Sequence, residues 1–72
     1  MMYYLYLGHL GNFYTENHKL ENMDIYCECC GEYDELVDTF KTREELTKLL
    51  VLAGAYDETI DYVVDRWESL YE

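Results

Sequence analysis

The sequence predicts an α+β fold, with a small antiparallel sheet from the N-terminal half followed by a two-helix C-terminal hairpin. Short, aromatic-rich apolar runs precede residue 41, and apolar residues at helical spacing follow it. The 72 residues suffice for one domain, with a β-rich part over 1–40 and the helical hairpin over 42–72. A chain this short buries only about 60% of its unfolded surface, so its core is marginal and often needs a staple or a partner.

Four short segments of the N-terminal half have the pattern of strands. The first is aromatic-rich, the second would return after a turn at Gly11 and Asn12, the third alternates apolar and polar residues, and the fourth is the weakest. Between the second and third, the polar stretch 16–22 is expected to be a loop. The four segments are Tyr3–Leu7, Phe13–Thr15, Met23–Cys27 and Glu35–Phe40.

The C-terminal third predicts two helices. Thr42 and Glu45 form the pattern of a capping box, and Gly54 is a suitable left-handed stop for the first helix. Asp57 is the expected N-cap of a second helix that runs to about Tyr71. The apolar faces are Leu46, Leu49, Leu50 and Ala53 in the first helix, and Ile60, Val63, Val64, Trp67, Leu70 and Tyr71 in the second.

The charge balance restricts the partners. Sixteen carboxylates against five Lys and Arg give a formal net charge of −11. Binding to nucleic acid relies on basic side chains that displace counterions, so direct binding of DNA or RNA is nearly excluded, and anionic membranes would repel the chain. The expected partners are a basic protein, above all one that binds nucleic acid, or a metal ion.

No export signal is visible at the start of the chain. The apolar opening MMYYLYLGHL has no preceding Lys or Arg and is far shorter than the ~20 residues that span a bilayer. Three crowded cysteines make a poor disulfide framework, which favours a reducing cytoplasm. We therefore expect a cytoplasmic protein, as a monomer or a homodimer.

The cysteines suggest half of a zinc site. Cys27-x-x-Cys30 followed by Gly31 has the spacing of a zinc knuckle, and His9 and His18 are candidates to complete a Cys2His2 set. The alternative is that the cysteines pack as small hydrophobic residues, with no cofactor. A redox role is less favoured, because the surrounding carboxylates are expected to raise the cysteine pKa.

The second helix carries a row of negative charges, which we call the acidic ridge. Its members step by four, four, three and four residues and share an arc of roughly 80°. Like charges at this spacing repel one another, so local stability does not explain the row. It is either the solvated face of an acidic protein or an imitation of a nucleic-acid backbone. The ridge consists of Asp57, Asp61, Asp65, Glu68 and Glu72.

A second acidic patch surrounds the cysteines, with no Lys or Arg between Lys19 and Lys41. Tyr26 and Tyr33 lie within it and are candidate contact anchors, because aromatic rings dominate many interfaces. The alternative is a flexible acidic loop. The patch consists of Glu21, Asp24, Glu28, Glu32, Asp34, Glu35 and Asp38.

Nothing in the sequence indicates catalysis. The glycines are too few and too isolated for a phosphate-binding loop, and Ser69 is the only serine. A chain of this size can hardly enclose a substrate pocket of several hundred Å³. We expect a protein that is not an enzyme.

The stretch DETIDYVVDRWESLYE and the acidic run from Glu21 to Asp38 resemble the small acidic inhibitors that bacteriophages and other mobile elements encode. Anti-CRISPR proteins and other DNA mimics share this size, charge and tyrosine content. The resemblance implies an inhibitor in the bacterial host cytoplasm that blocks the nucleic-acid site of an effector such as a CRISPR nuclease. The rival hypotheses are a small structural or adaptor module, with or without a zinc staple, and an antitoxin-like partner of a basic protein.

Overall fold

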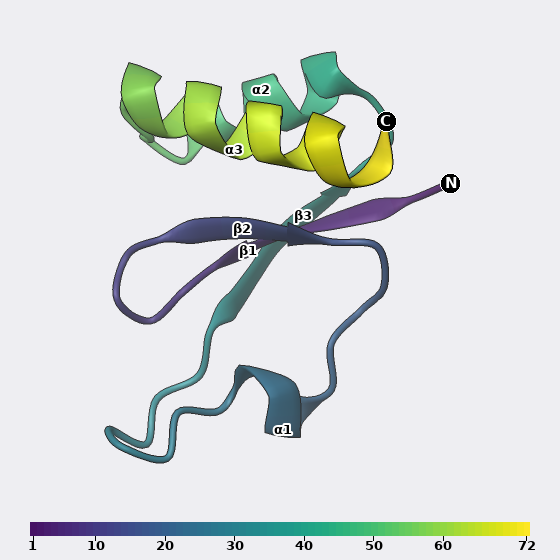
Figure 1. The fold of residues 1–72 in the computed structure, drawn as a ribbon. Helices are drawn as coiled ribbons and strands as arrows, with labels where there is room; N and C mark the ends of the chain where they lie inside the picture. Colours follow the sequence, from purple (N-terminus) through teal and green to yellow (C-terminus); the bar gives the residue numbers. More distant parts are fainter.

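The computed structural model describes all residues from Met1 to Glu72. The chain forms three strands and three helices, which Figure 1 shows. They are β1 (Tyr3–Leu7), β2 (Phe13–Glu16), α1 (Asn22–Ile25), β3 (Glu35–Phe40), α2 (Arg43–Leu52) and α3 (Asp57–Tyr71).

The strands form one antiparallel sheet in the order β2-β1-β3. Helices α2 and α3 cover one face of this sheet, and α1 with its flanking loops lies on the far side (Figure 1). The predicted α+β class is confirmed, with a sheet in the N-terminal half and a C-terminal pair of helices, although the helices number three and not two.

The hydrophobic core lies between the sheet and the two long helices. Aromatic rings meet at its centre, where Tyr3 stacks on Phe40 at 5.6 Å and meets Trp67 edge-on at 5.4 Å between ring centroids. Such aromatic pairs add stability beyond the area they bury. The buried members of the core are Tyr3, Leu5, Phe40, Leu46, Leu50, Val63, Val64 and Trp67.

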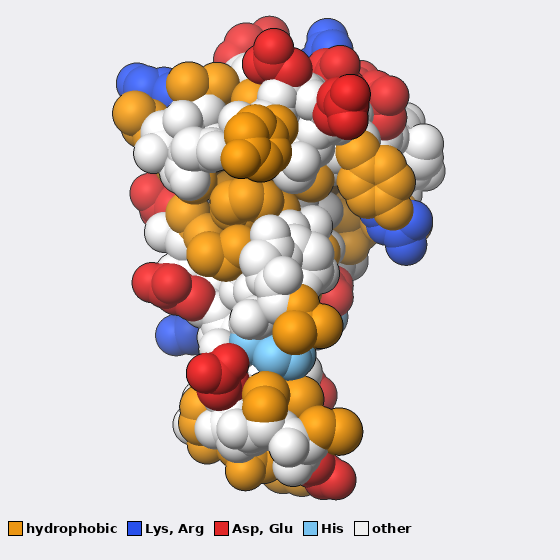
Figure 2. All heavy atoms as spheres, turned by 90° about the vertical axis from the view of Figure 1, so that its left-hand side faces the viewer, with side chains coloured by type: hydrophobic (Ala, Val, Ile, Leu, Met, Phe, Trp, Pro, Cys, Tyr) orange, Lys and Arg blue, Asp and Glu red, His pale blue; other side chains and the backbone are white.

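The segment 17–34, which we call the lobe, contains no buried residue. The rest of the chain, which we call the body, holds all of the buried side chains. Figure 2 shows the lobe as a narrower lower part of the molecule, with a histidine side chain where it meets the body. The lobe therefore has no hydrophobic core of its own.

The lobe meets the body at the sheet face that the long helices leave open. There Tyr6 is buried and stacks on Tyr14, with 5.4 Å between ring centroids. The Tyr6 hydroxyl accepts a hydrogen bond from the Leu20 backbone N–H at 2.8 Å, which fixes the start of the lobe to β1.

The helix ends differ in part from the predicted caps. Thr42 does cap α2, because its hydroxyl oxygen accepts from the Glu45 backbone N–H at 3.2 Å, whereas the Glu45 carboxylate faces that hydroxyl and makes no return bond to the backbone. Asp57 was predicted as the N-cap of α3, but Tyr56 holds this position and has no capping side-chain bond. Asp57 lies instead in the first turn, where a negative charge interacts favourably with the helix dipole.

Two other sequence predictions are wrong. The stretch Met23–Cys27 is not a strand, because a capping box between Glu21 and Asp24 starts the short helix α1 and only Tyr26 goes on to pair with a partner. Leu70 and Ala53 are exposed, Leu70 to 57%, and do not join the core faces of their helices, whereas Tyr71 beside Leu70 packs on Tyr3.

None of the helices combines the length and the apolar character that a membrane crossing requires.

Candidate metal centre

The Cys27-x-x-Cys30 segment folds into a tight hairpin turn within the lobe. The Gly31 N–H donates to the Cys27 carbonyl at 2.7 Å, and the Cys27 N–H donates to the Glu32 carbonyl at 2.8 Å. Gly31 has a φ of 72°, a left-handed conformation that glycine adopts without strain. Tyr26 and Tyr33 pair across the base of this hairpin. This geometry fixes the backbone on both sides of the two thiols.

The same turn alters the acidity of the thiols. Hydrogen bonds from the Cys30 backbone, from its side chain and from the Cys29 backbone lower the pKa of Cys27. The pKa of Cys30 is raised, because the nearby Cys27 thiol and burial together outweigh the opposing hydrogen bond from the Glu32 backbone. The expectation that the carboxylates would raise the pKa of both cysteines is therefore wrong for Cys27, which forms the thiolate more readily than an ordinary cysteine.

His9 reaches the thiols from the turn between β1 and β2. The Gly8 N–H donates to the Asn12 carbonyl at 2.6 Å, and the Gly11 N–H donates to the Gly8 carbonyl at 2.9 Å, which closes this turn. A Cβ at position 8 would lie 2.2 Å from the Asn12 Oδ1, so a side chain there would displace Asn12. A larger residue beside the histidine would therefore require the Asn12 side chain to move.

Asp34 orients the His9 ring. Its Oδ1 accepts from the His9 backbone N–H at 2.9 Å and lies 2.9 Å from the ring Nδ1, while its Oδ2 accepts from the Tyr14 hydroxyl at 2.6 Å. A carboxylate can only accept, so Nδ1 carries the proton and Nε2 remains as the donor atom for a metal ion.

These contacts shift the acidity of all three groups. The hydrogen bond to Asp34 raises the pKa of His9 above its ordinary value of 6.5. The bonds from Tyr14 and His9 lower the pKa of Asp34 below 3.8, so Asp34 is ionised at neutral pH. Burial, together with the hydrogen bond to Asp34, raises the pKa of Tyr14, which therefore stays protonated.

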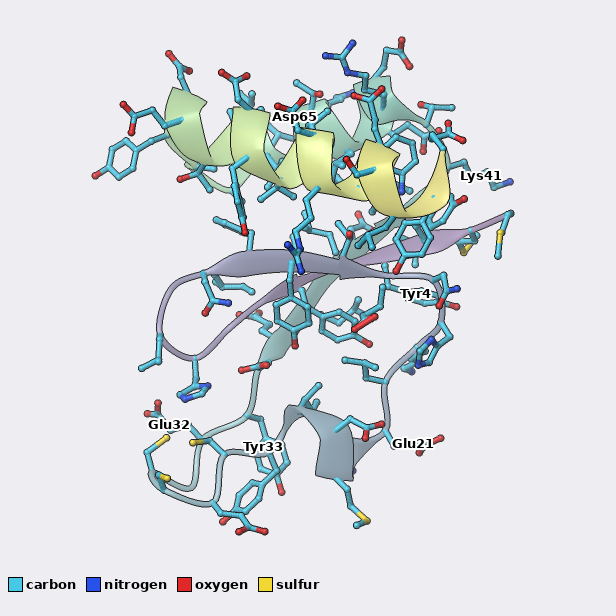
Figure 3. The ribbon with its side chains drawn as sticks, in the orientation of Figure 1. Tyr4, Glu21, Glu32, Tyr33, Lys41 and Asp65 are labelled. Atoms are coloured by element: carbon cyan, nitrogen blue, oxygen red, sulfur yellow. The ribbon has the colours of Figure 1, made fainter.

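His9, Cys27 and Cys30 form a candidate metal-binding group, with donor atoms that lie within 4.8 Å of one another. Figure 3 shows the sulfur atoms close together beside Glu32, at the tip of the lobe. His18, the fourth ligand proposed from the sequence, lies outside the group. It is exposed, and its Nδ1 contacts Asn17 Oδ1 at 2.8 Å.

The acidic residues proposed to bind a partner are divided between two surfaces. Most members of the acidic ridge are exposed along α3, and Figure 3 shows Asp65 on this helix. Glu68 is half-buried, and it pairs with Arg43 at 3.3 Å. The exposed carboxylates of the ridge are those of Asp57, Asp61, Asp65 and Glu72.

In the second patch Glu28, Glu32 and Glu35 are exposed, whereas Asp34 is half-buried and occupied by His9 and Tyr14. Asp34 therefore acts inside the protein and offers little to a partner.

The two tyrosines proposed as contact anchors lie at the tip of the lobe. Tyr26 and Tyr33 pack on each other with 5.0 Å between ring centroids, yet they remain 43% and 57% exposed. Their rings thus stabilise the hairpin and still present apolar surface to solvent.

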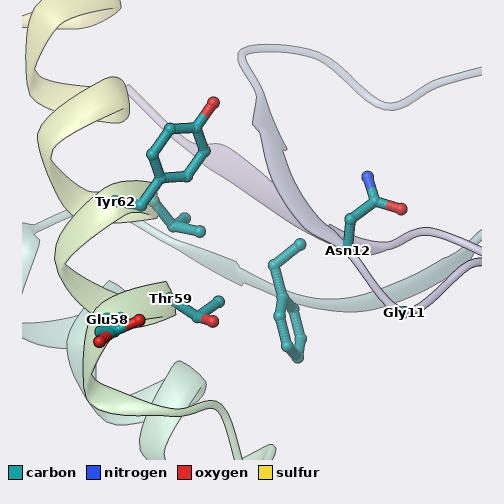
Figure 4. A pocket seen from close by; sticks show the side chains of 7 residues that line it. Gly11, Asn12, Glu58, Thr59 and Tyr62 are labelled. Carbon is teal, nitrogen blue, oxygen red and sulfur yellow. The ribbon is translucent and has the colours of Figure 1, made fainter.

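A separate open pocket of about 310 Å³ lies between α3 and the β1–β2 turn. Figure 4 shows Tyr62 and Thr59 of α3 facing Asn12 and Gly11 of the turn. Glu58 is its one carboxylate and lies beside the hydroxyls of Thr59 and Tyr62, and no histidine, cysteine, lysine or arginine lines the pocket. The side chains best suited to bind a metal ion are therefore gathered at His9, Cys27 and Cys30 and not in this pocket.

These features define a small α+β protein with two cysteines and a histidine gathered at a knuckle-like turn. In a comparison with protein families, residues 16–60 match the zinc finger domain of DNA polymerase-epsilon. The match covers more than half of the chain, which therefore belongs to this family. No curated protein and no solved structure matches the chain.

The matched segment contains all three cysteines, whereas His9 lies before it. The histidine thus comes to the site from a part of the chain outside the family match. Sequence reasoning named His9 but missed Asp34 and Tyr14 as the groups that orient it. For Asp34 the sequence shows only a carboxylate shortly after the CxxC turn, and this chain has many carboxylates. For Tyr14 the sequence shows no signal.

Proposed function

We propose that the chain is a small structural or adaptor module in which zinc, bound by Cys27, Cys30 and His9, staples the lobe to the body. The observation that carries this proposal is the absence of any buried residue in the lobe. A segment without a core does not hold one conformation by apolar burial, and small domains commonly use a structural metal for this purpose.

The donor set suits zinc. Thiolates and imidazole are the ligands that zinc prefers in structural sites, and tetrahedral ligands at about 2.3 Å from the ion lie about 3.8 Å from one another. A separation of at most 4.8 Å between the donor atoms is therefore closed by small side-chain rotations. The lowered pKa of Cys27 further favours the thiolate that a metal requires.

The residues that hold the His9 ring also suit a zinc site. A histidine that ligates a metal commonly donates its other ring N–H to a carboxylate, which fixes both the tautomer and the ring orientation. Asp34 makes this bond to His9 and is itself held by Tyr14. Membership of a zinc finger family points to the same metal.

The test is the metal content of protein purified without chelator, measured by native mass spectrometry and elemental analysis. We expect one zinc per chain, lost in Cys27→Ser and in His9→Asn. Cys29→Ser and His18→Asn are matched controls that should retain the metal, because both side chains lie outside the group. A wild-type chain that takes up no zinc from an excess, or a Cys29→Ser variant as depleted as Cys27→Ser, would refute the proposal.

A second candidate function, inhibition of a basic nucleic-acid-binding protein, is favoured by one observation. The acidic ridge is exposed along α3, and only Glu68 within it pairs with a cation of the chain, Arg43. An unneutralised row of charge attracts a cationic groove over a distance and weakens with salt. In this proposal the ridge occupies the site where the partner normally holds DNA or RNA.

This second proposal is tested by capture of proteins from a bacterial lysate, followed by competition with added DNA. The double variant Asp61→Lys/Asp65→Lys should lose the captured partner, and raising the salt should release it. Glu28→Lys/Glu32→Lys makes the same charge change on the lobe and serves as the matched control. If the ridge variant binds as well as the wild type does, the ridge is not the interface.

A further inference from the structure

The metal-binding group supplies three donors, one fewer than zinc takes. Zinc in protein sites is tetrahedral, and a site with three protein ligands keeps its remaining position for a ligand from outside. The only other cysteine and histidine of the chain are Cys29 and His18, and neither belongs to the group.

Local geometry keeps Cys29 away from the group. Its side chain is exposed, and its sulfur is not among the donor atoms that lie within 4.8 Å of one another. His18 stands in the loop after β2 and contacts its neighbour Asn17. No carboxylate belongs to the group: Asp34 accepts hydrogen bonds from His9 and Tyr14, and Glu28 and Glu32 of the same hairpin also lie outside it.

The group is open to solvent. Cys30 is exposed, Cys27 is half-buried, and the His9 side chain is 21% exposed. Apart from the β1–β2 turn that carries His9, no element of the body lies against the cysteine hairpin, as Figure 1 shows. A ligand from outside the chain can therefore reach a metal ion held there.

We infer that the Cys27–Cys30–His9 site keeps an open coordination position and that this position takes a neutral nitrogen donor, such as the imidazole of a partner's histidine. The inference rests on the proposed zinc staple. Two thiolates already balance the charge of the metal ion, and the exposed carboxylates of Glu28 and Glu32 stand in the same hairpin. An anionic ligand is repelled by these charges, whereas a neutral donor is not.

The experiment uses the full chain loaded with cobalt(II), which takes the place of zinc and has visible absorption bands that report its ligands. Imidazole and azide are titrated separately into the wild-type protein and into Cys29→Ser. We expect imidazole to shift the bands with saturation in both proteins, and azide to bind about tenfold more weakly because of the neighbouring carboxylates.

Two results would overturn the inference while leaving the staple intact. One is a cobalt spectrum that neither ligand changes and that loses thiolate character in Cys29→Ser, which would mean that Cys29 closes the site. The other is a stoichiometry of one cobalt per two chains that neither added ligand changes, which would mean that the donors of two copies fill the site and leave no open position. A chain that binds neither cobalt nor zinc would refute the staple itself, and the open position with it.

Discussion

The body and the lobe are stabilised in different ways. The body buries a connected set of aliphatic and aromatic side chains between the sheet and the helices, whereas no residue of the lobe is buried. The lobe is tied to the sheet by hydrogen bonds that converge on Asp34 and Tyr6. Burial distributes stability over many contacts, but a polar attachment depends on a few atoms. Replacing one polar group should therefore loosen the lobe while the body stays folded, whereas the body unfolds only when a central core side chain is removed.

The largest effect is expected in the body. Trp67 is 1% exposed and contacts both Tyr3 and Phe40, so Trp67→Ala should cost about 3–5 kcal/mol of unfolding free energy. Small domains have about 5–15 kcal/mol in total, so this change brings the body close to unfolding. Urea denaturation followed by far-UV circular dichroism measures it. Tyr62→Ala, at an exposed position of the same helix, is the control and should change little.

Metal removal should affect the lobe alone. With EDTA, the amides of residues 17–34 should exchange with solvent as fast as those of a mobile loop, while the amides of α2 and α3 keep their protection. Hydrogen exchange measured by mass spectrometry resolves the two regions. Equal loss of protection in the helices would show that the two regions are not independent.

A smaller change is expected when the orienting carboxylate is replaced. Asp34→Asn removes the charge that holds the His9 ring and should lower zinc affinity about 10–100-fold. Competition with a metal chelator measures this affinity. Glu32→Gln removes one negative charge from an exposed position in the same hairpin and should have a much smaller effect. Equal effects of the two variants would mean that charge alone, and not ring orientation, sets the affinity.

The smallest effect concerns pH and the body. Burial, the charge of Glu16 and the neighbouring Tyr3 raise the pKa of Tyr71 above its ordinary value of 10.0. The neutral phenol is thus favoured in the folded state, so this stability is fully present below pH 10 and is lost as pH rises through the folded pKa. Urea denaturation of Tyr71→Phe across this range should show less alkaline destabilisation than the wild type. An unchanged pH profile would contradict the assignment.

The sequence predicts the body better than the lobe. Strands β1 and β3 and helices α2 and α3 appear within a residue or two of the predicted bounds, because apolar periodicity reports directly which face is buried. Leu70 and Ala53 are the exceptions, since periodicity places both on core faces but both are exposed.

Apolar periodicity does not predict the structure of the lobe, because no face of the lobe is buried. The alternation in Met23–Cys27 suggested a strand, yet the local bonds between Glu21 and Asp24 favour a helical turn. Asp34 was interpreted as part of an acidic surface, and its contact with His9 depends on two segments that are distant in sequence. The lowered pKa of Cys27 depends on backbone hydrogen bonds that composition does not predict.

The separation of His9 from Cys27 along the chain has a consequence for the order of assembly. In the proposed zinc staple, Cys27 and Cys30 lie close together in sequence and would capture an ion before the rest of the chain has folded, whereas His9 would arrive only when the β1–β2 turn has formed and met the lobe. An ion caught early would be held loosely and then clamped as the sheet closes. A molecule that retains its metal ion would then be one that has folded completely.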